Sequence, residues 1–231
     1  MTTNSRPPHL TVLAFDAYGT LFDVFSVTAL CEDFFPARGT ALSQLWRAKQ
    51  LHYTLLCSLM GRHRNFWHLT EDALVYACRS LSLELPADRR QRLMNAYLRL
   101  DAFPDARPVL ERLKDQGMRL AILSNGEPQM LQAATNHARI APLLDAIISV
   151  EDVGVFKPSP RVYNLVSERL CVATRHIGFV SSNSWDVAGA ASAGLTTFWV
   201  RRAGAEPEEE LGFPATHVVG ALTEVPALLQ R

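Results

Sequence analysis

Short apolar runs recur along the chain, and the later ones alternate with amphipathic segments. The runs are rich in Val, Ile, Leu and Phe, and they begin at Leu10, Arg119, Ala146, Ile177 and Thr196. Such runs are typical of strands that are buried on both faces of a parallel sheet. Between the later runs lie helical patterns such as DARPVLERLKDQG, in which Asp105 is a candidate N-cap and Gly117 a C-terminal stop. This alternation predicts an α/β fold with a doubly wound parallel sheet.

The interval between the first two runs has a different pattern. From about residue 24 to residue 100 there is no comparable strand signal. The segment ALSQLWRAKQLHYTLLCSLM instead places six apolar side chains near one helical face, namely Leu42, Leu45, Trp46, Tyr53, Leu56 and Met60. A further helix, TEDALVYACRSL, is expected to begin near Thr70 or Asp72. We therefore predict an α/β core formed by residues 1–23 and 101–231, and an inserted helical cap formed by residues 24–100.

The composition indicates a folded globular protein with no strong overall field. Hydrophobic residues make up 48% of the 231 positions, and 23 basic residues balance 23 acidic ones. A net charge of zero does not favour nucleic acid or an anionic membrane as a partner. Four cysteines without a CxxC pair favour reduced, packed thiols over a disulfide framework or a zinc site. No apolar run approaches the roughly 18 residues of a membrane span, and MTTNSRPPHL has no apolar segment, so we expect a cytoplasmic protein.

The cap carries a local excess of positive charge. Five cations and no acidic residue lie between residues 34 and 70, namely Arg38, Arg47, Lys49, Arg62 and Arg64. A solvated helix face accounts for most of them. Arg47 directly follows Trp46 and flanks the apolar stripe, so it is the candidate to face the sheet and receive an anion.

Polar side chains cluster at four places after the predicted strands. The clusters supply Asp16 and Thr20 in FDAYGT, Ser124 and Asn125 in ILSNG, Lys157 in VFKPSP, and Ser181, Asn183 and Asp186 in VSSNSWD. In a parallel sheet such clusters converge on one crevice at the carboxyl ends of the strands. An ammonium beside Asp16 favours its ionised form, so Asp16 and Lys157 together predict a nucleophilic carboxylate.

Each of these residues also has a purely structural explanation. Ser124 and Asn125 are able to cap the following helix, Asp186 is a possible N-cap, and Lys157 is a possible surface loop residue. The occurrence of all four clusters in order favours the catalytic interpretation.

The four clusters resemble the motifs of the haloacid dehalogenase (HAD) superfamily, and they span almost the whole chain. The resemblance implies a Rossmann-like core with an inserted cap. In phosphatase members a second Asp, two residues after the nucleophile, acts as general acid, and an Asp in the last motif helps to hold Mg²⁺. Tyr18 and Ser182 occupy those two positions here. A halide needs no proton donor, unlike an alkoxide, and a haloacid lacks the phosphoryl charge that a metal offsets.

These two replacements favour the (S)-2-haloacid dehalogenases, also called L-2-haloacid dehalogenases, which the sequence closely resembles. The resemblance implies a cofactor-independent and metal-independent hydrolase that converts (S)-2-haloalkanoic acids to (R)-2-hydroxyalkanoic acids through an ester on Asp16. The positions that match the family's catalytic group are Asp16, Thr20, Arg47, Lys157, Ser181, Asn183 and Asp186. Those that match its substrate-binding group are Tyr18, Arg47, Leu51, Phe66, Ser124, Asn125, Tyr163 and Trp185.

Several alternatives stay open at this point. Leu51, Phe66 and Trp185 also have an explanation as core residues. Ala48 and His52 stand where relatives often have longer polar or acidic residues, which bears on the substrate range. A Mg²⁺-dependent phosphatase with a changed acid and a non-catalytic binding module are the competing functions. The family's tendency to dimerise suggests a homodimer, with the apolar cap helices as the interface.

Overall fold

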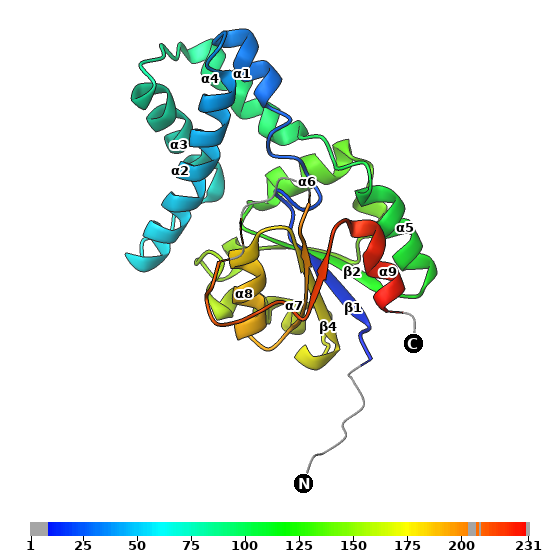
Figure 1. Cartoon of the computed structure of the whole chain (residues 1–231). Helices are drawn as coiled ribbons and strands as arrows, with labels where there is room; N and C mark the ends of the chain where they lie inside the picture. The colour runs from blue at the N-terminus through cyan, green and yellow to red at the C-terminus, as the bar shows by residue number, and fades with distance from the viewer. Residues whose placement is uncertain (1–8, 203–206, 208, 230–231) are drawn as a thin grey trace.

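A six-stranded parallel sheet forms the centre of the molecule (Figure 1). The computed structural model describes residues 9–202, 207 and 209–229. Its strands are β1 (Val12–Phe15), β2 (Arg119–Ser124), β3 (Ala146–Ser149), β4 (Ile177–Ser181), β5 (Thr196–Val200) and β6 (His217–Val219). Their order is β3-β2-β1-β4-β5-β6, and each neighbouring pair is parallel. The five predicted strands and the α/β fold class are confirmed, and β6 is an additional short strand at one edge.

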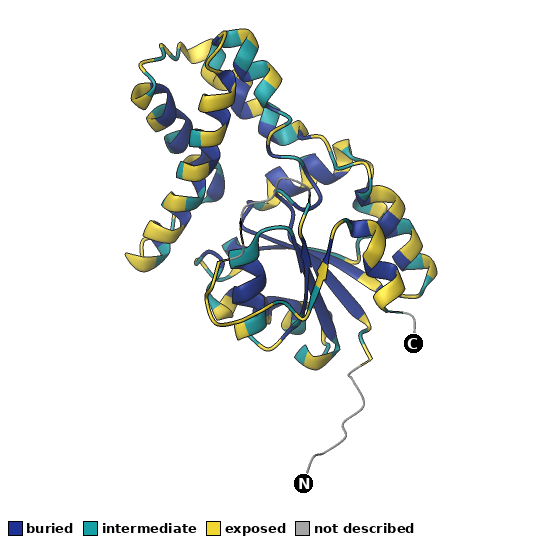
Figure 2. Ribbon diagram, viewed as in Figure 1, coloured by how far each residue is buried: buried dark blue, intermediate teal, exposed yellow. Residues whose placement is uncertain are grey.

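Strand β1 lies in the middle of the sheet, where the direction of winding reverses. From β1 the chain adds β2 and β3 on one side, and it then crosses to add β4, β5 and β6 on the other. All four residues of β1 are fully buried, as Figure 2 shows for the centre of the sheet. Open α/β sheets bind their ligands at such a reversal, beyond the carboxyl ends of the strands. Residues that follow β1 and β4 are therefore placed where chemistry is expected.

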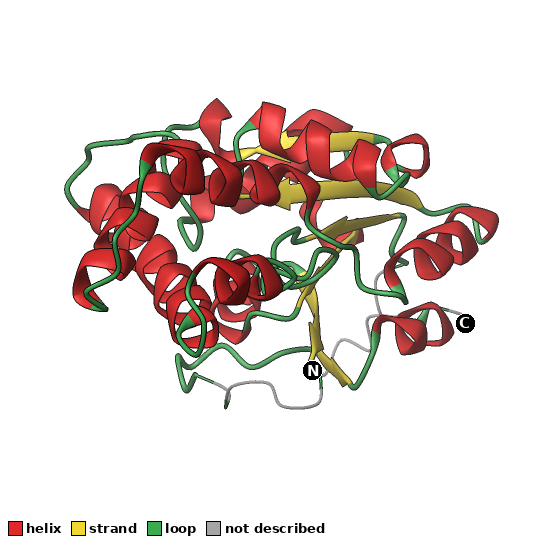
Figure 3. Cartoon of the chain, turned by 90° about the horizontal axis from the view of Figure 1, so that it is seen from above, coloured by secondary structure: helices red, strands yellow, loops and turns green. Residues whose placement is uncertain are grey.

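Helices surround the sheet, as Figure 3 shows from above. In the core these are α5 (Ala106–Asp115), α6 (Pro128–His137), α7 (Pro160–Leu170), α8 (Ser184–Ser192) and α9 (Val225–Leu228). Short 3₁₀ helices are η1 (Tyr97–Arg99), η2 (Ala141–Leu143), η3 (Val150–Asp152), η4 (Thr174–His176) and η5 (Leu222–Glu224). None of the helices in the described part of the chain is long and apolar enough to cross a membrane.

Of the two predictions for the ends of α5, the stop at Gly117 is confirmed and the side-chain cap by Asp105 is not. Gly117 follows the helix with a φ of 79°, a left-handed conformation that favours glycine, as the prediction of a stop there requires. Asp105 stands at the N-cap position, but its side chain makes no cap hydrogen bond. Its carboxylate instead accepts two bonds from the Arg202 guanidinium, at 3.0 Å each, and one from the Leu222 amide. The charged guanidinium outcompetes the helix amides and ties α5 to the C-terminal part of the chain.

Four further helices stand together at one end of the core (Figure 1). They are α1 (Thr28–Phe34), α2 (Gly39–Leu59), α3 (Phe66–Ser80) and α4 (Ala87–Ala96). The expected start of the second helix near Thr70 or Asp72 is wrong. Helix α3 begins one turn earlier, because the Asn65 side chain accepts a bond from the His68 amide and so caps it. Thr70 lies inside the helix and is fully buried.

The predicted apolar stripe on α2 is only partly correct. Leu42 and Trp46 are fully buried, whereas Leu56 and Met60 are 39% and 63% exposed. These two side chains face solvent near the C-terminal end of the helix, so apolar spacing there does not imply burial. Its buried positions include a series of polar residues instead, namely Ser43, Arg47, Gln50 and Thr54.

Candidate active site

Asp16, Lys157 and Asp186 form a buried ionic group at the carboxyl ends of β1 and β4. Asp16 follows β1 directly, and Asp186 lies in the first turn of α8, after β4. The Lys157 ammonium is 3.0 Å from Asp16 Oδ1 and 2.9 Å from Asp186 Oδ2. Burial acts to lower the pKa of Lys157, but the two carboxylates outweigh it and hold that pKa above its usual value. The structure therefore places a lysine cation beside Asp16.

The second oxygen of the Asp16 carboxylate is held as firmly as the first. Asp16 Oδ2 accepts bonds from the Thr20 hydroxyl and from the Asn183 side-chain amide, each at 2.9 Å. Thr20 also accepts a bond from the Ser182 backbone amide, at 2.9 Å. The turn after β1 is thereby joined to the end of β4, and the orientation of the carboxylate is fixed at both oxygens.

Asp186 is the second carboxylate that binds the Lys157 ammonium. Its Oδ2 accepts from Lys157 and from Ser181 Oγ at 3.1 Å, and its Oδ1 accepts from the Tyr163 hydroxyl at 2.7 Å. Burial raises the pKa of Asp186 to about 6. Burial and the adjacent Asp186 charge hold the pKa of Tyr163 well above its usual value, so the hydroxyl remains a donor. The side chain of Asp186 serves this network and does not act as the N-cap of α8.

Ser124 and Asn125 take part in the same site and do not cap a helix. Helix α6 begins later, with Glu127 at its N-cap position. Asn125 Oδ1 accepts from the Lys157 backbone amide at 3.0 Å, which positions the lysine segment. Ser124 Oγ accepts from the Gly126 amide at 3.1 Å, so its hydroxyl proton is available to another acceptor.

Arg47 reaches the site from α2. Its side chain is only 8% exposed, and Nη2 donates to the backbone carbonyl of Tyr18 at 3.2 Å. The Asn183 amide donates to the same carbonyl at 3.2 Å, so one oxygen links α2 to the residues that follow β1 and β4. The other cap cations have different surroundings. Arg64, for example, forms an exposed ion pair with Asp72.

A small cavity is lined by seven of the eight predicted substrate-binding residues and by Asp16 and Asn183. Its lining consists of Asp16, Tyr18, Arg47, Leu51, Phe66, Ser124, Asn125, Asn183 and Trp185. The ring of Phe66 stacks on that of Tyr18, with centroids 5.5 Å apart. The Tyr18 hydroxyl is buried and has no hydrogen-bond partner among the described residues, and burial raises its pKa above the usual value. Of the predicted substrate group, Tyr163 lies outside the lining and contacts Asp186 instead.

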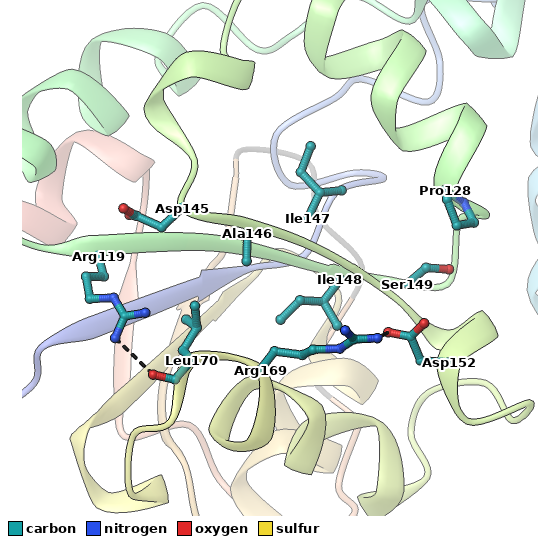
Figure 4. Close-up of a pocket in the computed structure, with 10 residues that line it drawn as sticks. All are labelled: Arg119, Pro128, Asp145, Ala146, Ile147, Ile148, Ser149, Asp152, Arg169 and Leu170. Carbon is teal, nitrogen blue, oxygen red and sulfur yellow. Dashed lines mark hydrogen bonds and ion pairs between the residues drawn. The ribbon is translucent and has the colours of Figure 1, made fainter.

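A larger cavity of about 450 Å³ lies along the outer edge of β3 (Figure 4). Its polar groups are already partnered. Arg169 pairs with Asp152 at 2.6 Å, and Arg119 donates to the Leu170 carbonyl. None of the residues predicted for the site lines this cavity. The chemistry is therefore assigned to the smaller cavity at β1 and β4.

Sequence reasoning missed several residues around the site. Gln50 accepts from Arg47 Nη1 at 2.7 Å, and its spacing of three positions along the same helix was an available signal. His63, between α2 and α3, pairs with Glu151 of η3 at 2.9 Å, and the Phe156 amide donates to Ser58 Oγ. These contacts join the cap to the segment that precedes Lys157. The partners are 88 and 98 positions apart, so no local pattern identifies them.

Comparisons with known proteins agree with this geometry. The family model described as haloacid dehalogenase-like hydrolase matches residues 10–194. The (S)-2-haloacid dehalogenase of Pseudomonas sp. (strain YL) is 47% identical over 218 residues, with 94% of each chain covered. The (S)-2-haloacid dehalogenase 4A of Burkholderia cepacia is 43% identical over 222 residues, with 96% of each chain covered.

A solved structure supports the same assignment. The L-2-haloacid dehalogenase from Xanthobacter autotrophicus, with chloropropionic acid covalently bound, superposes with a TM-score of 0.90 at 39% identity. The match covers 96% of this chain and 98% of that one. The family model, the sequence identity and the superposition agree with the geometry of the buried ionic group. This chain therefore belongs to the HAD superfamily and, within it, to the (S)-2-haloacid dehalogenases.

Proposed function

We propose that the chain hydrolyses (S)-2-haloalkanoic acids to (R)-2-hydroxyalkanoic acids, with Asp16 as the nucleophile. The observation that carries this proposal is one cavity lined by both Asp16 and Arg47. The Lys157 ammonium lies 3.0 Å from the Asp16 carboxylate, and Arg47 offers a positive charge to a leaving anion. Residues 24–100 act as the cap that supplies Arg47.

In the first step a carboxylate oxygen of Asp16 attacks C2 of the haloacid from the side opposite the halogen. The new C–O bond forms as the C–X bond breaks, so the configuration at C2 inverts. The halide leaves with the bonding electron pair and meets the Arg47 guanidinium. The Ser124 hydroxyl, whose proton is available, donates to the substrate carboxylate, and Asn125 adjoins it in the lining. Tyr18, Leu51, Phe66 and Trp185 enclose the alkyl part of the substrate.

In the second step water attacks the carbonyl carbon of the Asp16 ester. Asp186, whose pKa is raised by burial to about 6, accepts the proton of the water and returns it to the departing alkoxide. The acyl C–O bond breaks, the hydroxyacid leaves, and one water oxygen stays in the Asp16 carboxyl group, which releases the second proton of the water to solvent and becomes a carboxylate again. Thr20, Ser181 and Asn183 keep Asp16, Asp186 and Lys157 in position through the bonds described above.

The fold family also contains Mg²⁺-dependent phosphatases, but the donor set here does not fit that ion. The Lys157 ammonium bridges Asp16 and Asp186 at 3.0 and 2.9 Å, so a cation of the protein already lies between the two carboxylates. Tyr18 and Ser182 supply no carboxylate at the positions of the phosphatase acids. We therefore infer a reaction that needs no cofactor and no metal.

The experiment is halide release from (S)- and (R)-2-chloropropionate, each with EDTA, beside hydrolysis of p-nitrophenyl phosphate with Mg²⁺. The proposal requires chloride release from the (S) isomer alone and no effect of EDTA. Cleavage of the phosphate ester without halide release would establish the phosphatase instead. If neither substrate reacts but a small anion binds tightly, the chain is a binding module.

We also propose that the chain forms a homodimer through its cap. Five exposed apolar side chains occur at the C-terminal end of α2 and on α3, namely Leu55, Leu56, Leu59, Met60 and Tyr76, each at least 39% exposed. Contiguous exposed apolar residues mark association surfaces, and a second copy presents the same side chains. Light scattering should give twice the chain mass for the parent and the monomer mass for Leu59→Lys, whereas a monomeric parent would reject the proposal.

The chain's environment is inferred from its thiols and charge. The cysteines Cys31, Cys57, Cys78 and Cys171 are all free. Burial raises the pKa of Cys31 to about 12 and that of Cys78 to about 11, so both are packed as neutral thiols. Reduced thiols fit a cytoplasmic protein, and the balanced charge fits a small-molecule substrate with no nucleic-acid or membrane partner.

A further inference from the structure

Arg47 is held in the cavity by neutral groups. Its Nη1 donates to Gln50 Oε1 at 2.7 Å, and its Nη2 donates to the Tyr18 carbonyl at 3.2 Å. Within the described part of the chain, no carboxylate forms an ion pair with it. A guanidinium has five N–H donors, and only two of them have a protein partner among the described residues, so no carboxylate offsets its positive charge.

The orientation of the Gln50 amide follows from its partners. Gln50 is fully buried, and its Nε2 donates to Thr70 Oγ1 at 2.7 Å. The Thr70 hydroxyl uses its single proton on the Phe66 carbonyl, also at 2.7 Å. Thr70 is therefore an acceptor toward Gln50, which obliges the amide nitrogen to face Thr70 and the amide oxygen to face Arg47. A flipped amide would lose both bonds inside a buried site.

The Gln50 amide also ties two helices together, because Arg47 lies in α2 and Thr70 in α3. The fully buried ring of Tyr97 packs on Trp46 of α2, with centroids 4.8 Å apart. Gln50 thus joins α2 to α3 while it holds the guanidinium.

A carboxylate in place of the Gln50 amide would also accept from Arg47, but it would form a buried ion pair. Such a pair would offset the positive charge of Arg47. The departing halide would then lose the stabilisation that a guanidinium provides, which is strong where water is excluded. We propose that Gln50 is a positioning residue of this dehalogenase: it aims the Arg47 guanidinium into the cavity and leaves its charge uncompensated for the halide. This inference rests on the role proposed above for Arg47.

The test compares Gln50→Glu and Gln50→Met with Gln44→Glu, a matched change at an exposed position of the same helix. The kcat and KM are measured for (S)-2-chloropropionate and (S)-2-bromopropionate. Chloride is the poorer leaving group and depends more on Arg47. Both Gln50 variants should lose up to about 10²-fold in kcat on the chloride substrate, the scale of effect that a misplaced group produces. They should lose less on the bromide substrate, with KM little changed, and Gln44→Glu should match the parent.

The diagnostic quantity is the bromide-to-chloride ratio of kcat. It compares two substrates on one preparation, so it is independent of the fraction of folded enzyme. A raised ratio in both Gln50 variants supports the inference. An unchanged ratio, with equal losses or none, overturns it and leaves Gln50 as a packing residue.

Arg47→Ala separates this inference from the proposal beneath it. If Arg47→Ala loses chloride turnover and the Gln50 variants retain it, the positioning role alone is wrong. If Arg47→Ala itself keeps the parent's chloride turnover, the role of Arg47 at the halide fails. If the parent releases no halide, the proposed function fails.

Discussion

Replacement of Lys157 by methionine tests the ionic group in depth. The side chain keeps its length and loses its charge, which leaves Asp16 and Asp186 buried without their shared cation. Lys157 is 1% exposed, and the two carboxylate side chains are 8% and 0% exposed. Removal of one member of a buried ion pair costs about 3–5 kcal/mol, because it strands a charge away from water.

The control is Lys114→Met. Lys114 pairs with Asp145 at a similar distance, 2.9 Å, but these side chains are 34% and 31% exposed. An ion pair open to solvent contributes about 0–1 kcal/mol, because water screens it and solvates the remaining charge. Both substitutions remove a lysine ammonium from an ion pair, but Lys157→Met does so for two buried carboxylates and Lys114→Met for one half-exposed carboxylate. The control therefore shows how much stability is lost with an ion pair that is open to solvent.

The pH dependence of the penalty gives a second readout. In Lys157→Met one of the stranded carboxylates should take up a proton in the folded state, at a pH above its unfolded value. Such a group stabilises the folded state at low pH, and this contribution is lost as the pH rises through its raised pKa. In the parent, the raised pKa of Lys157 adds to the free energy of unfolding at every pH below the usual lysine pKa. This stabilisation is therefore present at both pH 5 and pH 8. The deficit of the variant should therefore be larger at pH 8 than at pH 5.

Urea unfolding followed by circular dichroism at pH 5 and pH 8 measures this deficit for parent, variant and control. Halide release on the same samples should be abolished in Lys157→Met and retained in Lys114→Met. The reasoning would be refuted if the two variants lost equal stability at pH 8. A deficit in Lys157→Met that did not change with pH would refute it as well.

Three further predictions concern single groups. Burial raises the pKa of Asp186 to about 6, and a protonated Asp186 is unable to accept the proton of the attacking water. The kcat should therefore fall as the pH drops through that value, and a flat profile from pH 5 to 7 would contradict this prediction. Tyr18→Phe removes a hydroxyl that has no partner among the described residues, so the free energy of unfolding should stay level or rise by about 1 kcal/mol, and a clear loss in a denaturant titration would show that the hydroxyl is bonded. Exposed Cys171 should react quickly with Ellman's reagent while buried Cys31 and Cys78 do not, and Cys171→Ser should remove the fast phase; persistence of that phase would contradict the burial pattern.

Much of the core was predictable because its signals are local. A strand buried on both faces leaves an unbroken apolar run, and a polar group at its end breaks that run at a definite residue. Asp16 and Ser124 were found in this way, at the ends of β1 and β2. Strand β6 was not found, because it is three residues long and lies at the sheet edge, with Val218 56% exposed. An edge strand of that length needs no periodic pattern.

The interior of the cap was less predictable, because its polar contacts join residues that are distant in sequence. Apolar spacing on α2 suggested burial of Leu56 and Met60, which are exposed, and gave no sign that Gln50 is buried. Gln50 is tolerated inside because Thr70, twenty positions away, accepts its amide proton. Arg47 was identified only because it adjoins Trp46 and matches a family motif. The start of α3 had a local signal in Asn65 that was overlooked.

The measurement that tests the central claim most directly is a single turnover in ¹⁸O-labelled water, with enzyme in excess over (S)-2-chloropropionate. Peptide mass spectrometry then locates the label. If an Asp16 ester is hydrolysed at its carbonyl carbon, one ¹⁸O atom enters the Asp16 side chain and the lactate carries none from the first turnover. Label found in the lactate and absent from Asp16 would mean that water attacks the substrate directly, and the nucleophilic role of Asp16 would be wrong.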